Sequence, residues 1–259
     1  MSGEPLLEGR ALHKVFGGYS AIVDVSIAVR RGSIHALIGP NGAGKTTLFN
    51  VITGVLPPTR GAVLVKGEDV TGARPDRITR LGVVRTFQSV RLFSSMTAHE
   101  NVRVGRHCRS RGGFASALLR VPFRASAAEA AAHKRADELL AQVGLQGKQN
   151  VRAGDLALAD QRRLEIARAL ASDPELLLLD EPVAGMTPVE VQESGRLLRA
   201  LRDRGITILL TEHHMSLVME ISDTVSVLNF GCKIAEGTPA EVRSNRQVLE
   251  AYLGTGEVV

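Results

Sequence analysis

Short apolar segments alternate with segments of helical character along most of the chain. The apolar segments are hydrophobic at successive positions, so both of their faces would be buried, as in strands covered by helices. The expected strands cover residues 33–38, 175–180, 206–211 and 225–228, and helices are expected at 45–54 and 188–204. This alternation predicts an α/β layered domain with a largely parallel sheet.

The stretch from residue 89 to residue 160 interrupts the alternation. Its segment 126–143 is rich in Ala, Arg and Glu and has strong helix formers throughout. Ser126 and Glu129 have the spacing of a capping box, which predicts that a helix starts at Ser126. Gly112 and Gly113 are typical of a flexible connection. We therefore expect a helical lobe inserted into the α/β domain.

The composition is that of an ordinary globular domain, with 44% hydrophobic and 23% charged residues among 259. Aromatic residues make up 3% and Trp is absent, which argues against a stacking surface for nucleic acid, so no nucleic-acid partner is expected. The 26 Arg and 6 Lys outweigh 27 acidic residues. This excess fits affinity for phosphates or an anionic membrane face, but it also fits Arg spread over solvated helix faces.

The sequence gives only weak evidence about the cellular compartment and about contact with a membrane. Cys108 and Cys232 lie far apart and outside any metal-ligand spacing, which suits a reducing cytosol. No apolar run approaches the length of about 18 residues that a membrane span needs, and the N-terminus has no stretch typical of a signal peptide. The chain is not expected to span a membrane, although it can sit on one.

A glycine-rich motif lies between an expected strand and an expected helix. Residues 39–46 match G-x-x-x-x-G-K-[ST], in which glycines let backbone N–H groups turn towards a phosphate at a helix N-terminus. Lys45 would contact the β- and γ-phosphates, and the Thr46 hydroxyl would bind Mg²⁺. The expected nucleotide-binding residues are Gly39, Pro40, Asn41, Gly42, Ala43, Gly44, Lys45, Thr46 and Thr47. The alternative is a glycine-rich turn with an exposed Lys.

Two carboxylates follow the leucine-rich strand at 175–180. A phosphate-binding loop predicts an acidic residue at the end of a neighbouring buried strand, and Asp180 occupies that position. Asp180 would hold Mg²⁺ through its water shell, and Glu181 would act on the attacking water as the general base. Since Pro182 follows, the pair could instead be a plain helix cap.

These motifs together resemble the ABC transporter ATPases. The resemblance implies that Gln88, in Thr86-Phe87-Gln88, contacts Mg²⁺ and the attacking water. It implies that His213 is the switch histidine that contacts the γ-phosphate, and that Phe16 stacks on adenine. The stretch 183–187 is similar to the family's D-loop. ATP and Mg²⁺ are the implied ligands, and ATP hydrolysis is the implied reaction.

Further segments resemble one subfamily, the importer ATPases for branched-chain amino acids and related amides or urea. These segments are 85–88, 91–93, 161–170, 184–186 and 250–254. The resemblance implies membrane permease subunits, a second ATPase subunit and, indirectly, a solute-binding protein as partners. It also implies a peripheral location on the cytoplasmic face of the inner membrane. A soluble ABC ATPase that is not coupled to a transporter, for example of the iron–sulfur assembly type, remains the alternative.

The expected organisation is a single ABC ATPase domain over residues 1–259. Its catalytic core comprises 1–88 and 161–235, its helical lobe 89–160, and its C-terminal helical tail 236–259. The expected fold class is α/β: a P-loop NTPase core with a mostly parallel sheet, a small antiparallel β part and the inserted lobe.

The chain departs from the family at the signature L-S-x-G-Q, whose helix N-terminus clamps the γ-phosphate bound to the opposite subunit. Residues 156–160 read Leu-Ala-Leu-Ala-Asp. Ala157 removes a hydroxyl donor, Ala159 adds a Cβ where backbone should approach phosphate, and Asp160 places a negative charge beside an anion. A heterodimer with an intact partner signature is favoured over a homodimer, which would have two weak sites.

Overall fold

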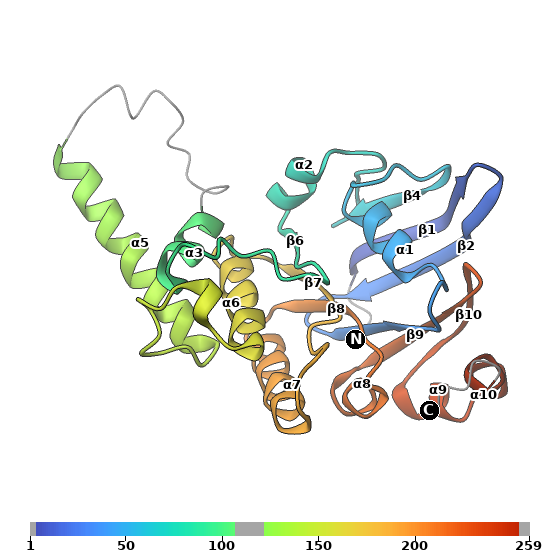
Figure 1. Cartoon of the computed structure of the whole chain (residues 1–259). Coiled ribbons are helices and arrows are strands. Elements are labelled where there is room, and N and C mark those ends of the chain that lie inside the picture. The colour runs from blue at the N-terminus through green and yellow to red at the C-terminus, as the bar shows by residue number, and fades with distance from the viewer. Residues whose placement is uncertain (1–3, 107–121, 254–259) are drawn as a thin grey trace. The chain divides into compact units, whose positions relative to one another are not determined.

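Residues 4–106 and 122–253 are described by the computed structural model, and the chain divides into two units. The first unit contains residues 1–88 and 175–259, and the second contains residues 89–174 (Figure 1). The sequence placed residues from 161 onwards in the core, whereas the structure groups 161–174 with the second unit. Cys108, Gly112 and Gly113 lie outside the described residues.

A six-stranded sheet forms the centre of the first unit, in the order β10-β9-β3-β8-β7-β6. Neighbouring strands are parallel except β10, which is antiparallel to β9. β3, β7 and β8 are buried at every position, as their mainly apolar sequences predict. The bounds are β3 Ile34–Ile38, β6 Val83–Arg85, β7 Leu176–Asp180, β8 Thr207–Thr211, β9 Thr224–Asn229 and β10 Cys232–Gly237.

A second sheet in this unit is antiparallel, in the order β2-β1-β4-β5. Its strands are β1 Pro5–Phe16, β2 Tyr19–Arg30, β4 Arg60–Val65 and β5 Glu68–Asp69. Gly17 and Gly18, both with positive φ, make the two-residue turn between β1 and β2. One apolar core joins residues of both sheets to the first helix, among them fully buried Phe49. The expected fold class, with its small antiparallel part, is confirmed.

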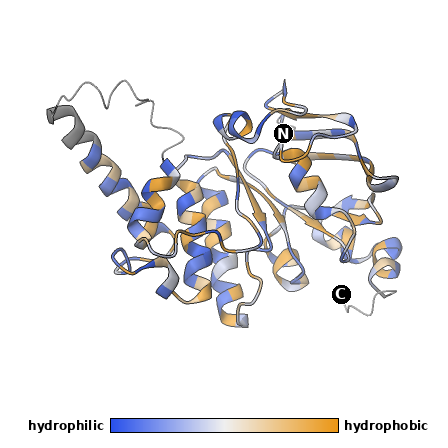
Figure 2. Cartoon of the chain, turned by 45° about the horizontal axis from the view of Figure 1, so that its top comes forward, coloured by the Kyte–Doolittle hydropathy of each residue, from blue (hydrophilic) through white to orange (hydrophobic). Residues whose placement is uncertain are grey.

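Six helices of the first unit are described: α1 Lys45–Ile52, α2 Pro75–Arg80, α7 Pro188–Asp203, α8 Met215–Ile221, α9 Pro239–Arg243 and α10 Arg246–Leu253. Hydrophobic residues concentrate on the strands and on the inner helix faces (Figure 2). α7 starts with a capping box between Thr187 and Glu190, and Pro188 takes the first helical position. These local signals fix where the helix after β7 begins.

The second unit is helical, with α3 Ala98–Gly105, α5 Pro122–Gln142, a 3₁₀ turn at Ala153–Asp155 and α6 Leu158–Leu170. α6 packs against α3 and α5, which is why it belongs to this unit. The predicted helix start at Ser126 is wrong, because α5 already begins at Pro122. Among the described residues, no helix has both the length and the apolar character needed to cross a bilayer.

Candidate active site

The turn between β3 and α1 is formed by the glycine-rich motif. Gly39 and Gly44 have φ of 149° and 102°. A Cβ on Gly39 would lie 2.1 Å from the Leu228 carbonyl oxygen, and a Cβ on Gly44 would lie 2.6 Å from that of Ala21. Both contacts are impossibly short. Glycine at these two positions therefore lets the turn lie directly against backbone of β9 and β2.

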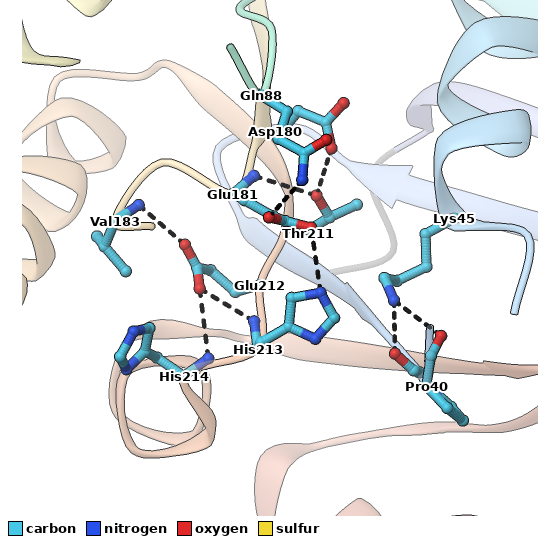
Figure 3. Close-up of polar contacts among 11 residues, drawn as sticks. Pro40, Lys45, Gln88, Asp180, Glu181, Val183, Thr211, Glu212, His213 and His214 are labelled. Carbon is cyan, nitrogen blue, oxygen red and sulfur yellow. Dashed lines mark hydrogen bonds and ion pairs between the residues drawn. The ribbon is translucent and has the colours of Figure 1, made fainter. Parts of the chain in front are cut away.

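Lys45 is the first residue of α1, and its side chain turns back over the glycine-rich turn. The residue is only 7% exposed. Its Nζ donates to the carbonyl oxygens of Gly39 at 2.5 Å and Pro40 at 3.0 Å (Figure 3). The first turn of α1 contains no acidic residue. A cation and the positive end of a helix dipole therefore meet here, an arrangement that favours an anion.

A pocket of about 340 Å³ opens at this turn. Its walls come entirely from the first unit: the β1–β2 hairpin, the glycine-rich turn with the start of α1, and two polar side chains from the ends of β6 and β7. The lining residues are Tyr19, Ala21, Asn41, Gly42, Ala43, Gly44, Lys45, Thr46, Thr47, Gln88 and Glu181. Most of the expected nucleotide-binding residues are thus brought together.

Phe16 is not among the residues that line this pocket, although the sequence singled it out as the base-stacking aromatic. It is cross-strand partner to Tyr19, which does line the pocket and is 61% exposed. The Nζ of Lys14 lies 5.1 Å from the centre of the Phe16 ring. Sequence reasoning missed Tyr19. The sequence signal for Tyr19 was its position three residues after Phe16, in a chain in which aromatic residues make up only 3%.

Asp180 ends β7 and is buried, with both carboxylate oxygens hydrogen-bonded. Oδ2 accepts from Nη2 of Arg85 at 2.7 Å, and Oδ1 accepts from the Thr211 hydroxyl at 2.8 Å. The Arg85 guanidinium also lies 5.4 Å from the Phe49 ring centre and 5.2 Å from that of Phe87. A buried, doubly stacked cation therefore fixes the Asp180 side chain.

Glu181 joins Gln88 and His213 in a cluster next to the pocket (Figure 3). Oε2 of Glu181 accepts from Nε2 of Gln88 at 2.8 Å. Oε1 lies 3.1 Å from Nε2 of His213. Three residues that follow three different strands thus meet through one carboxylate.

Arg85, Thr211 and Glu212 were not predicted as site residues. Arg85 carried a signal only as part of the segment 85–88. Glu212 lies next to His213 in the sequence and is 1% exposed. A charged residue directly after a fully buried strand is unusual without a partner, and this was the signal that could have drawn attention to Glu212.

Comparison with known families decides what this arrangement belongs to. A family model described as "ABC transporter" matches residues 22–184, which include the glycine-rich turn, Gln88, Asp180 and Glu181. The chain belongs to the ABC transporter ATP-binding family. A second model, "Branched-chain amino acid ATP-binding cassette transporter", matches residues 232–258 of this ABC transporter protein.

Relatives resemble this ABC transporter ATPase along nearly its whole length. The "High-affinity branched-chain amino acid transport ATP-binding protein LivG" of Escherichia coli (strain K12) is 47% identical over 97% of this chain and 98% of its own. The corresponding BraF protein of Pseudomonas aeruginosa is 45% identical over 96% and 98%. The solved ADP conformation of the cassette MJ1267 has a TM-score of 0.84 at 31% identity and covers 97% of this chain and 100% of its own. The chain is therefore an ATP-binding ATPase whose reaction is coupled to transport.

The signature region of this ABC transporter ATPase lies in the second unit, at the start of α6. Ala157 is the N-cap and provides no side-chain hydrogen bond. Asp160, which the sequence analysis described as a negative charge beside an anion, has basic side chains around it. Its side chain is largely buried, hydrogen-bonded to Lys148, and 3.7 Å from Nη1 of Arg163. Most of its charge is thereby compensated within the unit.

A loop that precedes α3 in this ABC transporter ATPase is held by side chains of α3 and α6. Asn101 accepts the N–H of Phe93 at 2.9 Å and donates to the carbonyl oxygen of Phe93 at 3.1 Å. Glu165 accepts the Arg91 N–H at 2.7 Å, and Arg168 donates to the Arg91 carbonyl oxygen at 2.5 Å. An irregular segment thus has a fixed backbone while Phe93 remains 47% exposed.

Proposed function

We propose that this ABC transporter ATPase energises an importer of branched-chain amino acids. The observation that supports the solute class is 47% identity with a protein named for that transport, over nearly the full length of both chains. The match of residues 232–258 to the branched-chain family model supports it at the C-terminal end. The solute itself is bound elsewhere, so these residues act on ATP alone.

The glycine-rich turn is the proposed phosphate site. Backbone N–H groups of residues 44–47, at the N-terminus of α1, are proposed to face the anion, and Lys45 supplies a point charge. The contacts of Lys45 with the Gly39 and Pro40 carbonyl oxygens hold its ammonium group at the turn in readiness for phosphate. Phe16, as the family resemblance implies, and Tyr19, which lines the pocket, are proposed to contact the adenine.

The residues present fit Mg²⁺, because they offer hydroxyl, amide and carboxylate oxygens, the hard donors that this ion prefers. Thr46 and Gln88 line the pocket. Both oxygens of Asp180 already accept hydrogen bonds from Arg85 and Thr211, so Asp180 fits contact through a water molecule better than direct ligation. Bound Mg²⁺ would neutralise charge on the phosphates.

Glu181 is the proposed general base for the attacking water. Glu181 lines the pocket, and its carboxylate is held by Gln88 through one oxygen and by His213 through the other. A carboxylate fixed in this way has a defined orientation from which to accept a proton. Gln88 orients the water, and His213 contacts the γ-phosphate and holds the Glu181 carboxylate. Catalysis of this kind depends on fixed positions more than on covalent chemistry.

The proposed partners are membrane permease subunits, a second ATPase subunit and, through the permeases, a solute-binding protein. The fixed loop around Arg91, Leu92 and Phe93 offers an exposed apolar and basic surface for a permease segment. A heterodimer is favoured because the altered signature of this chain would weaken both sites of a homodimer. The proposed location is the cytoplasmic face of the inner membrane.

The test is ATP-driven uptake by the complete transporter. The chain is co-expressed with its permease and second ATPase subunits, reconstituted in vesicles with the binding protein, and supplied with MgATP. We expect uptake of radiolabelled leucine and none of urea, with uptake lost on Glu181→Gln. Uptake of urea in place of leucine would contradict the solute class. Phosphate release that is unaffected by the presence of permeases would contradict the coupling.

A further inference from the structure

A buried carboxylate beside the proposed catalytic cluster has no assigned part in hydrolysis. Glu212 follows β8 and is 1% exposed. Oε1 accepts the N–H of Val183 at 2.9 Å, and Oε2 accepts those of His213 at 3.0 Å and His214 at 3.3 Å. The hydrogen bonds that the described structure gives this carboxylate all come from backbone N–H groups. Its position therefore determines where those backbone segments lie.

Glu212 connects the two segments that carry Glu181 and His213. Val183 lies two residues after Glu181, and the His213 ring reaches back to Glu181 at 3.1 Å. Figure 3 shows the resulting closed path, from Glu181 through Val183, Glu212 and His213 back to Glu181. The ends of β7 and β8 are also joined by the Glu181–His213 contact, by the Glu181 N–H, which donates to the carbonyl oxygen and hydroxyl of Thr211, and by the Thr211 hydroxyl, which donates to Asp180. The Glu212 link extends this connection past Glu181 to Val183.

Burying a carboxylate in this position costs free energy unless its oxygens accept hydrogen bonds. Burial raises the pKa of the Glu212 carboxyl, and the N–H groups of Val183, His214 and His213 lower it. A glutamine of the same shape has one acceptor oxygen, and its NH₂ group would face N–H donors. At least one backbone N–H would then lose its partner in a buried place.

We propose that Glu212 is a positioning residue for ATP hydrolysis, which holds the His213 ring and the turn after Glu181 at the spacing that the reaction requires. The proposal rests on the proposed function of Glu181 and His213. Because Glu212 does not line the pocket, its removal is expected to reduce the rate of hydrolysis and leave nucleotide affinity intact.

The experiment uses the purified full chain in excess over radiolabelled MgATP, so that a slow single turnover is measurable. The variants are Glu212→Gln, Glu212→Asp, His213→Ala and the double variant Glu212→Gln/His213→Ala. Glu220→Gln is the matched control, because Glu220 is an exposed carboxylate on α8 that pairs with Arg199. Nucleotide affinity is measured by calorimetry and folding by thermal unfolding.

We expect Glu212→Gln to hydrolyse ATP about 10- to 100-fold more slowly at an affinity within about two-fold of the wild type. Glu212→Asp, which keeps the charge, should recover part of the rate. In the His213→Ala background, Glu212→Gln should slow hydrolysis by a smaller factor than it does in the wild type, since the part of its effect that passes through His213 is already lost.

Three results would overturn the proposal: a wild-type rate in Glu212→Gln, effects of Glu212→Gln and His213→Ala that multiply, or a loss of affinity and folding in parallel with the rate in both Glu212 variants. A different result separates the proposed function from this inference. If the wild-type chain fails to hydrolyse ATP, or Glu181→Gln hydrolyses it normally, the function fails and the role of Glu212 fails with it.

Discussion

Glu181 has a backbone φ of 49°, in the left-handed region that non-glycine residues seldom adopt. Its N–H donates to the Thr211 carbonyl oxygen at 3.1 Å, which ties this conformation to the end of β8. Strain of this kind costs about 1–3 kcal/mol and persists only where the surroundings impose it. Here it turns the chain sharply after the buried strand, at the residue whose carboxylate meets Gln88 and His213.

Substitutions can distinguish the proposed role of Glu181 in hydrolysis from the proposed role of Lys45 in nucleotide binding. Glu181→Gln keeps the shape of the side chain and removes the base, so turnover should fall by at least about 100-fold while MgATP affinity is retained. Lys45→Ala removes a charge from the phosphate site, so affinity itself should fall by about 10-fold or more. Phosphate release and calorimetry measure the two effects. A Glu181→Gln chain that turns over at the wild-type rate would exclude Glu181 as the base.

His35 makes the stability of the fold depend on pH. It is buried in β3, with Nε2 at 2.8 Å from the Ser226 hydroxyl, and burial lowers its pKa from 6.5 to about 4. Between these values the unfolded chain binds a proton that the folded chain does not. Stability should therefore be lost as the pH falls from about 6.5 to about 4, at roughly 1.4 kcal/mol per pH unit for this group.

The variant His35→Gln isolates this contribution, because glutamine does not titrate. Between pH 7 and pH 5, the wild-type free energy of unfolding should fall by about 2 kcal/mol more than that of the variant. Urea unfolding at the two pH values measures the difference, and the comparison of slopes is independent of any constant destabilisation by the substitution. Parallel pH dependences would mean that His35 binds its proton as readily in the folded chain as in the unfolded chain.

At the scale of elements, the strands and turns that carry the site were predictable, and the pairing between them was not. β3, β7 and β8 are apolar on both faces, and the glycine-rich turn has a fixed spacing, so each is visible in a short window of sequence. The Arg85–Asp180 ion pair joins residues 95 positions apart. Such pairs depend on strand order in the sheet, which periodicity does not encode.

The start of α5 illustrates the same limit for helices. Ser126 and Glu129 have capping-box spacing, yet the helix already begins at Pro122. Proline is well suited to the first turn of a helix, and Ala-rich sequence after Ser126 continues it. The capping-box spacing at Ser126 therefore lies inside the helix and does not mark its start. The capping boxes at Thr97, Thr187 and Thr238, by contrast, do start their helices.

Asn101 is one of the side chains that hold the loop before α3. Asn101, which is fully buried, exchanges two hydrogen bonds with the backbone of Phe93 and donates to the Thr97 carbonyl oxygen at 3.0 Å. Asn101→Ala leaves buried backbone groups without partners, so the chain should lose about 2–4 kcal/mol of stability. Thermal unfolding measures the loss, with exposed Glu138→Gln on α5 as the control. Equal stability of Asn101→Ala and the control would show that water replaces these bonds.

At the scale of the whole molecule, the chain is proposed to act as one part of an assembly, and Phe93 tests its contact with the membrane subunits. Phe93→Glu places a charge on an exposed apolar side chain whose backbone Asn101 fixes. We expect loss of co-purification with the permeases and unchanged ATP affinity of the isolated chain. Val189→Glu is the control, because Val189 is an apolar residue on α7 that is even more exposed than Phe93. Full assembly of Phe93→Glu would exclude this surface as the docking site.

The altered signature gives the assembly its expected asymmetry. Lys45, Thr46, Gln88, Glu181 and His213 all come from one chain, whereas the helix N-terminus that clamps the γ-phosphate comes from the opposite subunit, as the family resemblance implies. In this chain that helix starts at Ala157, which offers no hydroxyl, and continues through Ala159. A homodimer would thus lack donors that act on charge developing in the transition state, where each is worth most.

Restoring the donors should therefore raise the turnover of a homodimer. Ala157→Ser adds a hydroxyl at the N-cap, and Ala159→Gly removes a Cβ near the proposed phosphate. Together they should increase steady-state phosphate release by about one to three orders of magnitude.

Adding Asp160→Gln should contribute less, because Lys148 and Arg163 already compensate the charge of Asp160, and its loss would leave Lys148 without this partner. The exposed Ala240→Ser on α9 is the control. The same substitutions should change little in a complex whose second ATPase carries an intact signature. Equal rates of wild type and variant, with dimer formation under MgATP verified, would show that the clamp does not limit hydrolysis.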